Sequence, residues 1–109
     1  MAYNETLAAR IHDRMANLPG YEEKKMFGGV GCLLNGNMAC GVHKEHLIVR
    51  VGPDNYEEAL AEPLSKVFDI TGRAMRGWVM IDSIGLDSDE LLDKWVHKGV
   101  TFAMTLPPK

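Results

Sequence analysis

The sequence predicts an α+β fold of two layers, in which helices pack on an antiparallel sheet. Apolar residues recur at helical spacing near both ends of the chain, and apolar runs bounded by turn residues fill the middle. Tight turns join successive runs, and strands joined by tight turns are antiparallel. The predicted order is helix, three strands, helix, two strands, helix (α-β-β-β-α-β-β-α), in a single domain over residues 1–109.

The first helix is predicted from an apolar stripe with spacings of four, four and three residues. The stripe consists of Leu7, Ile11, Met15 and Leu18. Asn4 is the expected N-cap, since asparagine accepts a hydrogen bond from the free amides of a first turn. Pro19-Gly20 is expected to end this helix.

The next part of the chain is predicted to be a β-meander. An extended segment runs from Lys24 to Leu34, and Asn35-Gly36 follows between apolar runs. This dipeptide favours a type I′ hairpin turn, because both of its residues tolerate positive φ. "HKEH" forms a second polar turn before the strand "LIVRV" (residues 47–51).

The hairpin turn also predicts a register for the two cysteines. A loop of two residues places Leu34 opposite Asn37, and an uninterrupted ladder then places Cys32 opposite Ala39. Side chains alternate between the faces of a sheet, so Cys32 and Cys40 are expected on opposite faces. This register excludes a disulfide between them, and the thiols are expected to be reduced.

The second half of the chain supplies the remaining elements. Pro53 pre-sets the backbone for a short helix over residues 56–61. "KVFDI" and "GWVMID" are the two further strands, joined by "TGRAMR". Asp87 and Glu90 resemble a capping box for the last helix. Its expected inner face consists of Leu92, Trp95, Val96, Val100 and Ala103, and Pro107-Pro108 ends it.

The glycine cluster "GGVG" is interpreted as part of the sheet. A phosphate-binding P-loop needs GxxxxGK[ST] between a strand and a helix, and a strand follows here. Cys40, His43 and His46 form C-x2-H-x2-H, which offers three metal ligands without a fourth nearby. We therefore expect a buried thiol and two turn histidines, with no metal, no cofactor and no catalytic constellation. An enzyme using Cys32 or Cys40 stays as a minor alternative.

Five basic residues on predicted strands and turns form the candidate binding patch. They are Lys24, Lys25, Arg50, Arg73 and Arg76. If their strands are neighbours, one end of the sheet carries positive charge that suits an acidic protein surface or phosphate groups. The alternative is a solvated face. Trp78 and the seven methionines are interpreted as core residues.

Charge and hydropathy exclude several classes of function. The net charge of −3 argues against direct, non-specific nucleic-acid binding, which needs a basic face. No apolar run approaches the ~18 residues of a membrane span. The N-terminus carries charges throughout and no signal-peptide core. We expect a cytoplasmic protein.

Four segments together resemble the N-terminal domain of TfoX/Sxy-type proteins, over essentially the whole chain. They are "KKMFGGVGCLLNGNMACGV", "LIVRVGP", "FDITGRAMRGWVMID" and "WVHKGVTFAMTLPPK". The resemblance implies a compact, bacterial α+β domain of the secretion-chaperone-like type. Full-length TfoX/Sxy proteins regulate natural competence together with a transcription activator, and they carry a C-terminal helical domain. We expect the present chain to be a stand-alone form of the N-terminal domain without that second domain. The resemblance brings no catalytic or ligand residues.

Two functional hypotheses follow from these observations. The first is a non-enzymatic regulatory domain that binds a protein partner, by resemblance from the transcription machinery, or a second copy of itself. An exposed sheet with free edge strands would serve either partner. The second is a small-ligand or anion-binding module whose pocket wall is the basic patch.

Overall fold

The computed structural model describes residues 3–26, 29–62, 64–68 and 76–108. Six strands form one antiparallel sheet in the order β1-β2-β3-β4-β6-β5. The strands are β1 (Tyr21–Met26), β2 (Gly29–Leu34), β3 (Asn37–His43), β4 (His46–Arg50), β5 (Ser65–Val67) and β6 (Trp78–Asp82).

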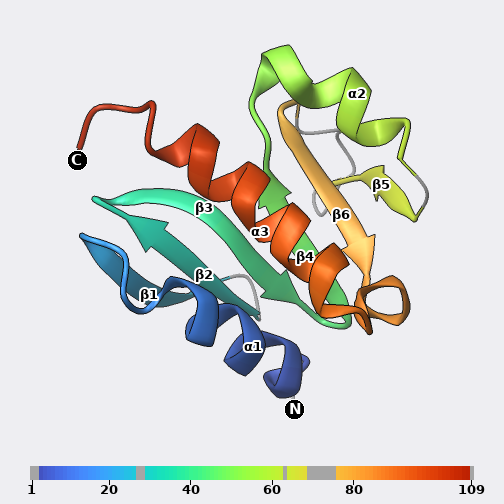
Figure 1. The fold of residues 1–109 in the computed structure, drawn as a ribbon, viewed down its shortest axis with the longest axis horizontal. Helices are drawn as coiled ribbons and strands as arrows, with labels where there is room; N and C mark the ends of the chain where they lie inside the picture. Colours follow the sequence, from blue (N-terminus) through green and yellow to red (C-terminus); the bar gives the residue numbers. More distant parts are fainter. Residues whose placement is uncertain (1–2, 27–28, 63, 69–75, 109) are drawn as a thin grey trace.

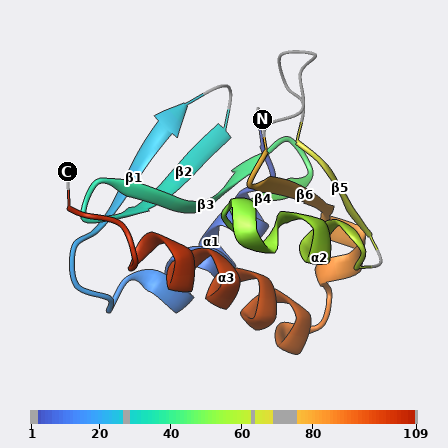
Figure 2. The ribbon, with the colours of Figure 1, turned by 90° about the horizontal axis from the view of Figure 1, so that it is seen from above.

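The helices lie on one side of this sheet, and α3 crosses it diagonally (Figures 1 and 2). The helices are α1 (Glu5–Met15), η1 (Pro53–Asn55), α2 (Tyr56–Leu60), η2 (Ser83–Leu86) and α3 (Asp89–Ala103). The predicted α+β class, with two layers and an antiparallel sheet, is confirmed. The extended segment predicted from Lys24 to Leu34 consists of two strands, β1 and β2.

The core lies between the helices and the sheet. The predicted stripe of α1 is confirmed for Leu7, Ile11 and Met15, which are 0–2% exposed, while Leu18 lies beyond the helix and is partly buried. The predicted inner face of α3 is buried except for the partly buried Val100. These faces pack on alternate side chains of the central strands, such as Leu47 and Val49.

The predicted cap of α1 is confirmed, and that of α3 is displaced by one residue. The Asn4 side chain accepts a hydrogen bond from the Leu7 amide at 3.0 Å. The N-cap of α3 is Ser88, whose hydroxyl accepts from the Leu91 amide, so Asp87 and Glu90 do not form the expected capping box. Both Asp87 and Ser88 are good cap residues, and the chain uses the second.

The hairpin turn is as predicted, but the register beyond it is not. Asn35 and Gly36 have φ of 54° and 84°, and Leu34 lies opposite Asn37. The register then shifts between Leu33 and Cys32, so Cys32 pairs with Cys40. One extra residue in β3 causes this β-bulge. The prediction that the cysteines lie on opposite faces is therefore wrong.

The sheet face away from the helices is not bare. Ile48 alternates with Leu47 and Val49, which point to the helices, yet Ile48 is only 2% exposed. Leu33 and Phe68 are 7% and 6% exposed and do not belong to the main core cluster. The expectation of an exposed sheet is therefore wrong at these three positions, which are buried outside the main core cluster.

Candidate functional site

Two short chain segments lie side by side where β4 ends and β6 begins. The Gly77 carbonyl accepts hydrogen bonds from the amides of Val51 and Gly52, at 2.8 and 3.0 Å. Gly52 and Gly77 have φ of 86° and 93°, a region that residues with a Cβ rarely adopt. These glycines hold Arg50 and Trp78 as directly paired residues at this end of the sheet.

Arg50 packs against two aromatic rings. Its guanidinium carbon lies 5.4 Å from the ring centroid of Trp78 and 5.3 Å from that of Phe102, which comes from α3. A Cβ on Gly52 would lie 2.4 Å from the Phe102 ring, so this ring fits only over glycine. Such cation–π contacts hold the guanidinium in place without neutralising it.

Arg76 extends the same surface. Its guanidinium carbon lies 5.7 Å from the Tyr56 ring of α2. In the part of the chain that the structure describes, no carboxylate lies within 4.0 Å of the guanidinium nitrogens of Arg50 or Arg76. We call Arg50, Arg76, Tyr56, Trp78 and Phe102 the arginine–aromatic cluster.

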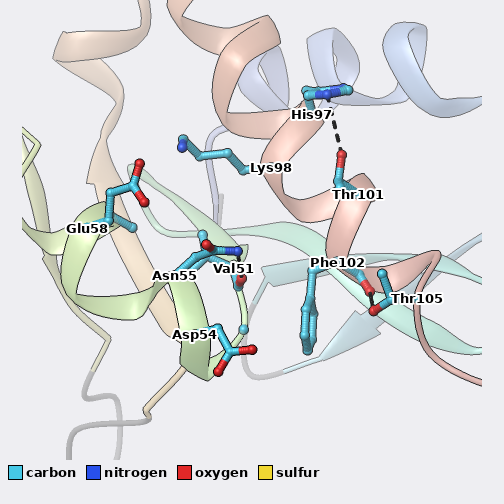
Figure 3. Close-up of a pocket in the computed structure, with 11 residues that line it drawn as sticks. Val51, Asp54, Asn55, Glu58, His97, Lys98, Thr101, Phe102 and Thr105 are labelled. Carbon is cyan, nitrogen blue, oxygen red and sulfur yellow. Dashed lines mark hydrogen bonds between the residues drawn. The ribbon is translucent and has the colours of Figure 1, made fainter.

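A hollow of about 520 Å³ opens beside this cluster, between α2 and α3 (Figure 3). Phe102 belongs both to the cluster and to the wall of the hollow. Asp54 and Glu58 line it from the side of η1 and α2, and His97 and Lys98 line it from α3.

The two walls of the hollow differ in charge. In Figure 3 Glu58 and Lys98 project from opposite walls, while His97 is turned to Thr101, with 3.4 Å between the His97 Nε2 and Thr101 Oγ1 atoms. The Lys98 Nζ atom is 3.7 Å from the Oε2 atom of Glu62, a residue that follows α2 and does not line the hollow. The α2 wall is acidic and the α3 wall carries the basic side chains.

The structure brings together only part of the predicted basic patch. Arg50 and Arg76 lie in the cluster, whereas Lys24 and Lys25 are exposed on β1, with β2 and β3 between β1 and β4. Lys24 and Lys25 are consecutive in a strand and so point to opposite faces. Arg73 lies outside the described residues. None of the described members lines the hollow.

Three members of the cluster were not predicted from the sequence as site residues. Trp78, interpreted there as a core residue, is half-buried beside Arg50, and Tyr56 and Phe102 come from two different helices. The available signal was glycine: "RVGP" and "RGW" each place a glycine within two residues of an arginine. Only the pairing of β4 with β6 shows that these two glycines meet.

The histidine turn gives no metal geometry. His43 and His46 pair across the β3–β4 turn, while Cys40 is fully buried in the main core. Among the described residues, no group of three or more His, Cys, Asp or Glu side chains is arranged to hold a metal ion. None of the described helices is both long and apolar enough to cross a membrane.

The fold defines a small domain in which three helices cover one side of a six-stranded antiparallel sheet. A comparison with protein families matches residues 13–103 to the TfoX N-terminal domain. This match covers more than four-fifths of the 109 residues, so the chain belongs to the TfoX N-terminal domain family. No curated protein matches the chain.

Proposed function

We propose that this chain is a non-enzymatic regulatory domain that acts by binding a protein partner. The arginine–aromatic cluster is the observation that carries the proposal. Arginine, tyrosine and tryptophan are the residue types that contribute most to the energy of protein interfaces. We expect the partner to belong to the transcription machinery, because the chain resembles regulators of competence that act with a transcription activator.

The chemistry of the cluster indicates which partner surface would fit. Arg50 is half-buried and stacked between Trp78 and Phe102, so a partner would not need to order a mobile side chain. Its fork of N–H donors matches a carboxylate in two parallel hydrogen bonds. We therefore expect a partner that presents aspartate or glutamate next to an apolar group.

Reversing the charge of Arg76 should weaken this interaction, whereas reversing that of Lys24 should not. Both side chains are exposed, but Arg76 lies in the cluster and Lys24 lies on β1, at the far side of β2 and β3. We expect Arg76→Glu to weaken binding at least about tenfold, near 1.4 kcal/mol. Proteins retained by tagged wild type, Arg76→Glu and Lys24→Glu would be identified by mass spectrometry, and affinities measured with the purified partner.

Lys24→Glu is the matched control, because it makes the same change of charge at an exposed site. Equal loss of binding in both variants would indicate general electrostatic attraction instead of the cluster. A partner that binds all three proteins equally would place the interface elsewhere. If no protein is retained specifically by the wild type, the proposal is wrong.

The hollow between α2 and α3 supports a second candidate function, the binding of a small molecule. Its volume of about 520 Å³ lies within the range of ligand sites. Because Asp54 and Glu58 line one wall and Lys98 lines the other, a small zwitterion with an amine and a carboxylate fits better than a simple anion. This differs from the expected anion pocket, since Lys24, Lys25, Arg50 and Arg76, the described members of the predicted basic patch, do not line the hollow.

Filling the hollow should remove this binding. Thr101 is exposed and lines the hollow, so Thr101→Phe would occupy part of the space with little effect on the core. We expect amino acids and related zwitterions to raise the Tm of the wild type but not of this variant, while inorganic anions leave both unchanged. A thermal-shift screen measures this, and equal shifts for both proteins would contradict it.

A further inference from the structure

The bulge in β3 brings the two cysteines of the chain together. Cys32 of β2 and Cys40 of β3 are direct cross-strand partners, and both are free thiols. They are 1% and 0% exposed and belong to the main core cluster beneath the helices. The pair therefore lies on one face of the sheet.

This arrangement meets the geometric demands of a disulfide. Directly opposed residues of antiparallel strands have Cα atoms about 4.5–5.5 Å apart, depending on the type of pair. Disulfides join Cα atoms about 4.4–6.8 Å apart. A bond between Cys32 and Cys40 therefore requires side-chain rotation and no movement of the strands.

The surroundings of the two thiols make them unequal. Hydrogen bonds from Cys40 and from the Tyr21 hydroxyl, which is 3.8 Å from the Cys32 sulfur, lower the pKa of Cys32. The hydrogen bond with Cys32 and complete burial raise the pKa of Cys40. The Cys40 sulfur lies 3.4 Å from the Met15 sulfur of α1. Cys32 is thus the thiol better suited to be a thiolate nucleophile.

Tyr21 marks the route from solvent to this pair. It lies on the edge strand β1, and its hydroxyl contacts both the Cys32 sulfur and the carboxylate of Glu23. The Glu23 side chain is 40% exposed, and its Oε1 atom lies 2.8 Å from the Nδ1 atom of His12 in α1. Tyr21 thus connects Cys32 with a half-exposed carboxylate at the sheet edge, and local opening of the edge strand would let a small oxidant approach the thiol.

We propose that Cys32 and Cys40 form a reversible disulfide site that responds to hydrogen peroxide. The Cys32 thiolate attacks one peroxide oxygen, and cleavage of the O–O bond gives a Cys32 sulfenic acid and hydroxide. The Cys40 thiol then attacks the Cys32 sulfur, forming the S–S bond and expelling the sulfenic oxygen as water, while the hydroxide from the first step takes up the proton that Cys32 lost on ionising. Two thiols lose two electrons and two protons in all, and the peroxide becomes two molecules of water. A dithiol reductant reverses the reaction by thiol–disulfide exchange.

Peroxide treatment of the native protein tests this directly. After free thiols are blocked by alkylation, mass spectrometry should find an intramolecular link between the Cys32 and Cys40 peptides, which dithiothreitol removes. The link closes a short loop across the hairpin, so we expect the oxidised wild type to gain roughly 5–10 °C in Tm. Cys32→Ser and Cys40→Ser should show no such gain.

The single-cysteine variants also test the assigned roles. Cys40→Ser keeps a hydroxyl beside Cys32, so its thiol should form a sulfenic acid about tenfold faster than that of Cys32→Ser, as measured by a dimedone probe. If either variant fails to fold, the disulfide mapping and the Tm of the oxidised wild type still test the proposal. Thiols that stay reduced in native protein, link only between molecules, or oxidise only at the rate of global unfolding would overturn the proposal.

Discussion

Replacing Gly99 with alanine is expected to lower the free energy of unfolding by about 2 kcal/mol, although alanine forms helices better than glycine. Gly99 lies inside α3, where its backbone approaches the bulged strand. An added Cβ would lie 2.3 Å from the Ala39 carbonyl oxygen and 3.3 Å from a Val49 methyl carbon. The Ala39 oxygen belongs to the backbone of a central strand and cannot move aside cheaply.

Propensity and packing act in opposite directions at this position. Alanine in a helix interior gains about 1 kcal/mol over glycine. The clash with Ala39 forces α3 away from the sheet, and with it the buried Trp95 and Val96 of the same helix. Forced repacking of a tight core typically costs about 1–3 kcal/mol. Because the clash at Gly99 is with a backbone oxygen, we expect a cost near the upper end of this range, which exceeds the gain in propensity.

Urea unfolding of wild type and Gly99→Ala measures this effect. Thr101→Ala is the matched control, since Thr101 is exposed two residues further along the same helix. That change should be neutral or stabilise the protein by a few tenths of a kcal/mol, to a first approximation. A Gly99→Ala variant as stable as the wild type would mean that α3 does not pack closely on the bulge.

Local patterns were sufficient to predict most of the architecture. The Asn35-Gly36 turn, the Asn4 cap and the apolar faces of α1 and α3 each depend on residues within a few positions of one another. Such features are fixed by backbone preference and by helical periodicity. The α+β class follows from their order along the chain.

The register of β3 could not be predicted from the turn. A turn sets the pairing only until the ladder is interrupted, and no residue type marks the bulge near Ala39. The bulge packs against Gly99 of α3, sixty positions further along the chain. Because Gly99 has no Cβ, the helix can approach the Ala39 carbonyl closely. The cysteine prediction failed because this contact is a property of the tertiary structure.

The candidate site was predictable only in part for a similar reason. Arg50 and Arg76 were selected by charge, but their convergence depends on β4 pairing with β6, across an intervening helix and the edge strand β5. The aromatic partners come from α2, α3 and β6. The charge of the two arginines was enough to select them from the sequence, whereas their aromatic neighbours are known only from the fold.

Truncating Ile48 to alanine is expected to cost about 2–4 kcal/mol, as for a core residue. Ile48 belongs to the sheet face away from the helices, yet it is only 2% exposed, and it lies opposite Gly41 on one side and Met80 on the other. The run Leu47, Ile48 and Val49 is buried at three consecutive positions. Such a run is typical of a strand covered on both faces.

Leu47→Ala provides the comparison for Ile48→Ala, because Leu47 is the preceding residue and points into the main core. Urea unfolding should give both variants losses of similar size. A loss for Ile48→Ala below about 0.5 kcal/mol is typical of an exposed site, and it would contradict the burial of Ile48 on this face. Ile48 would then be available to a protein partner, and the interface would be sought across the open sheet as well as at the arginine–aromatic cluster.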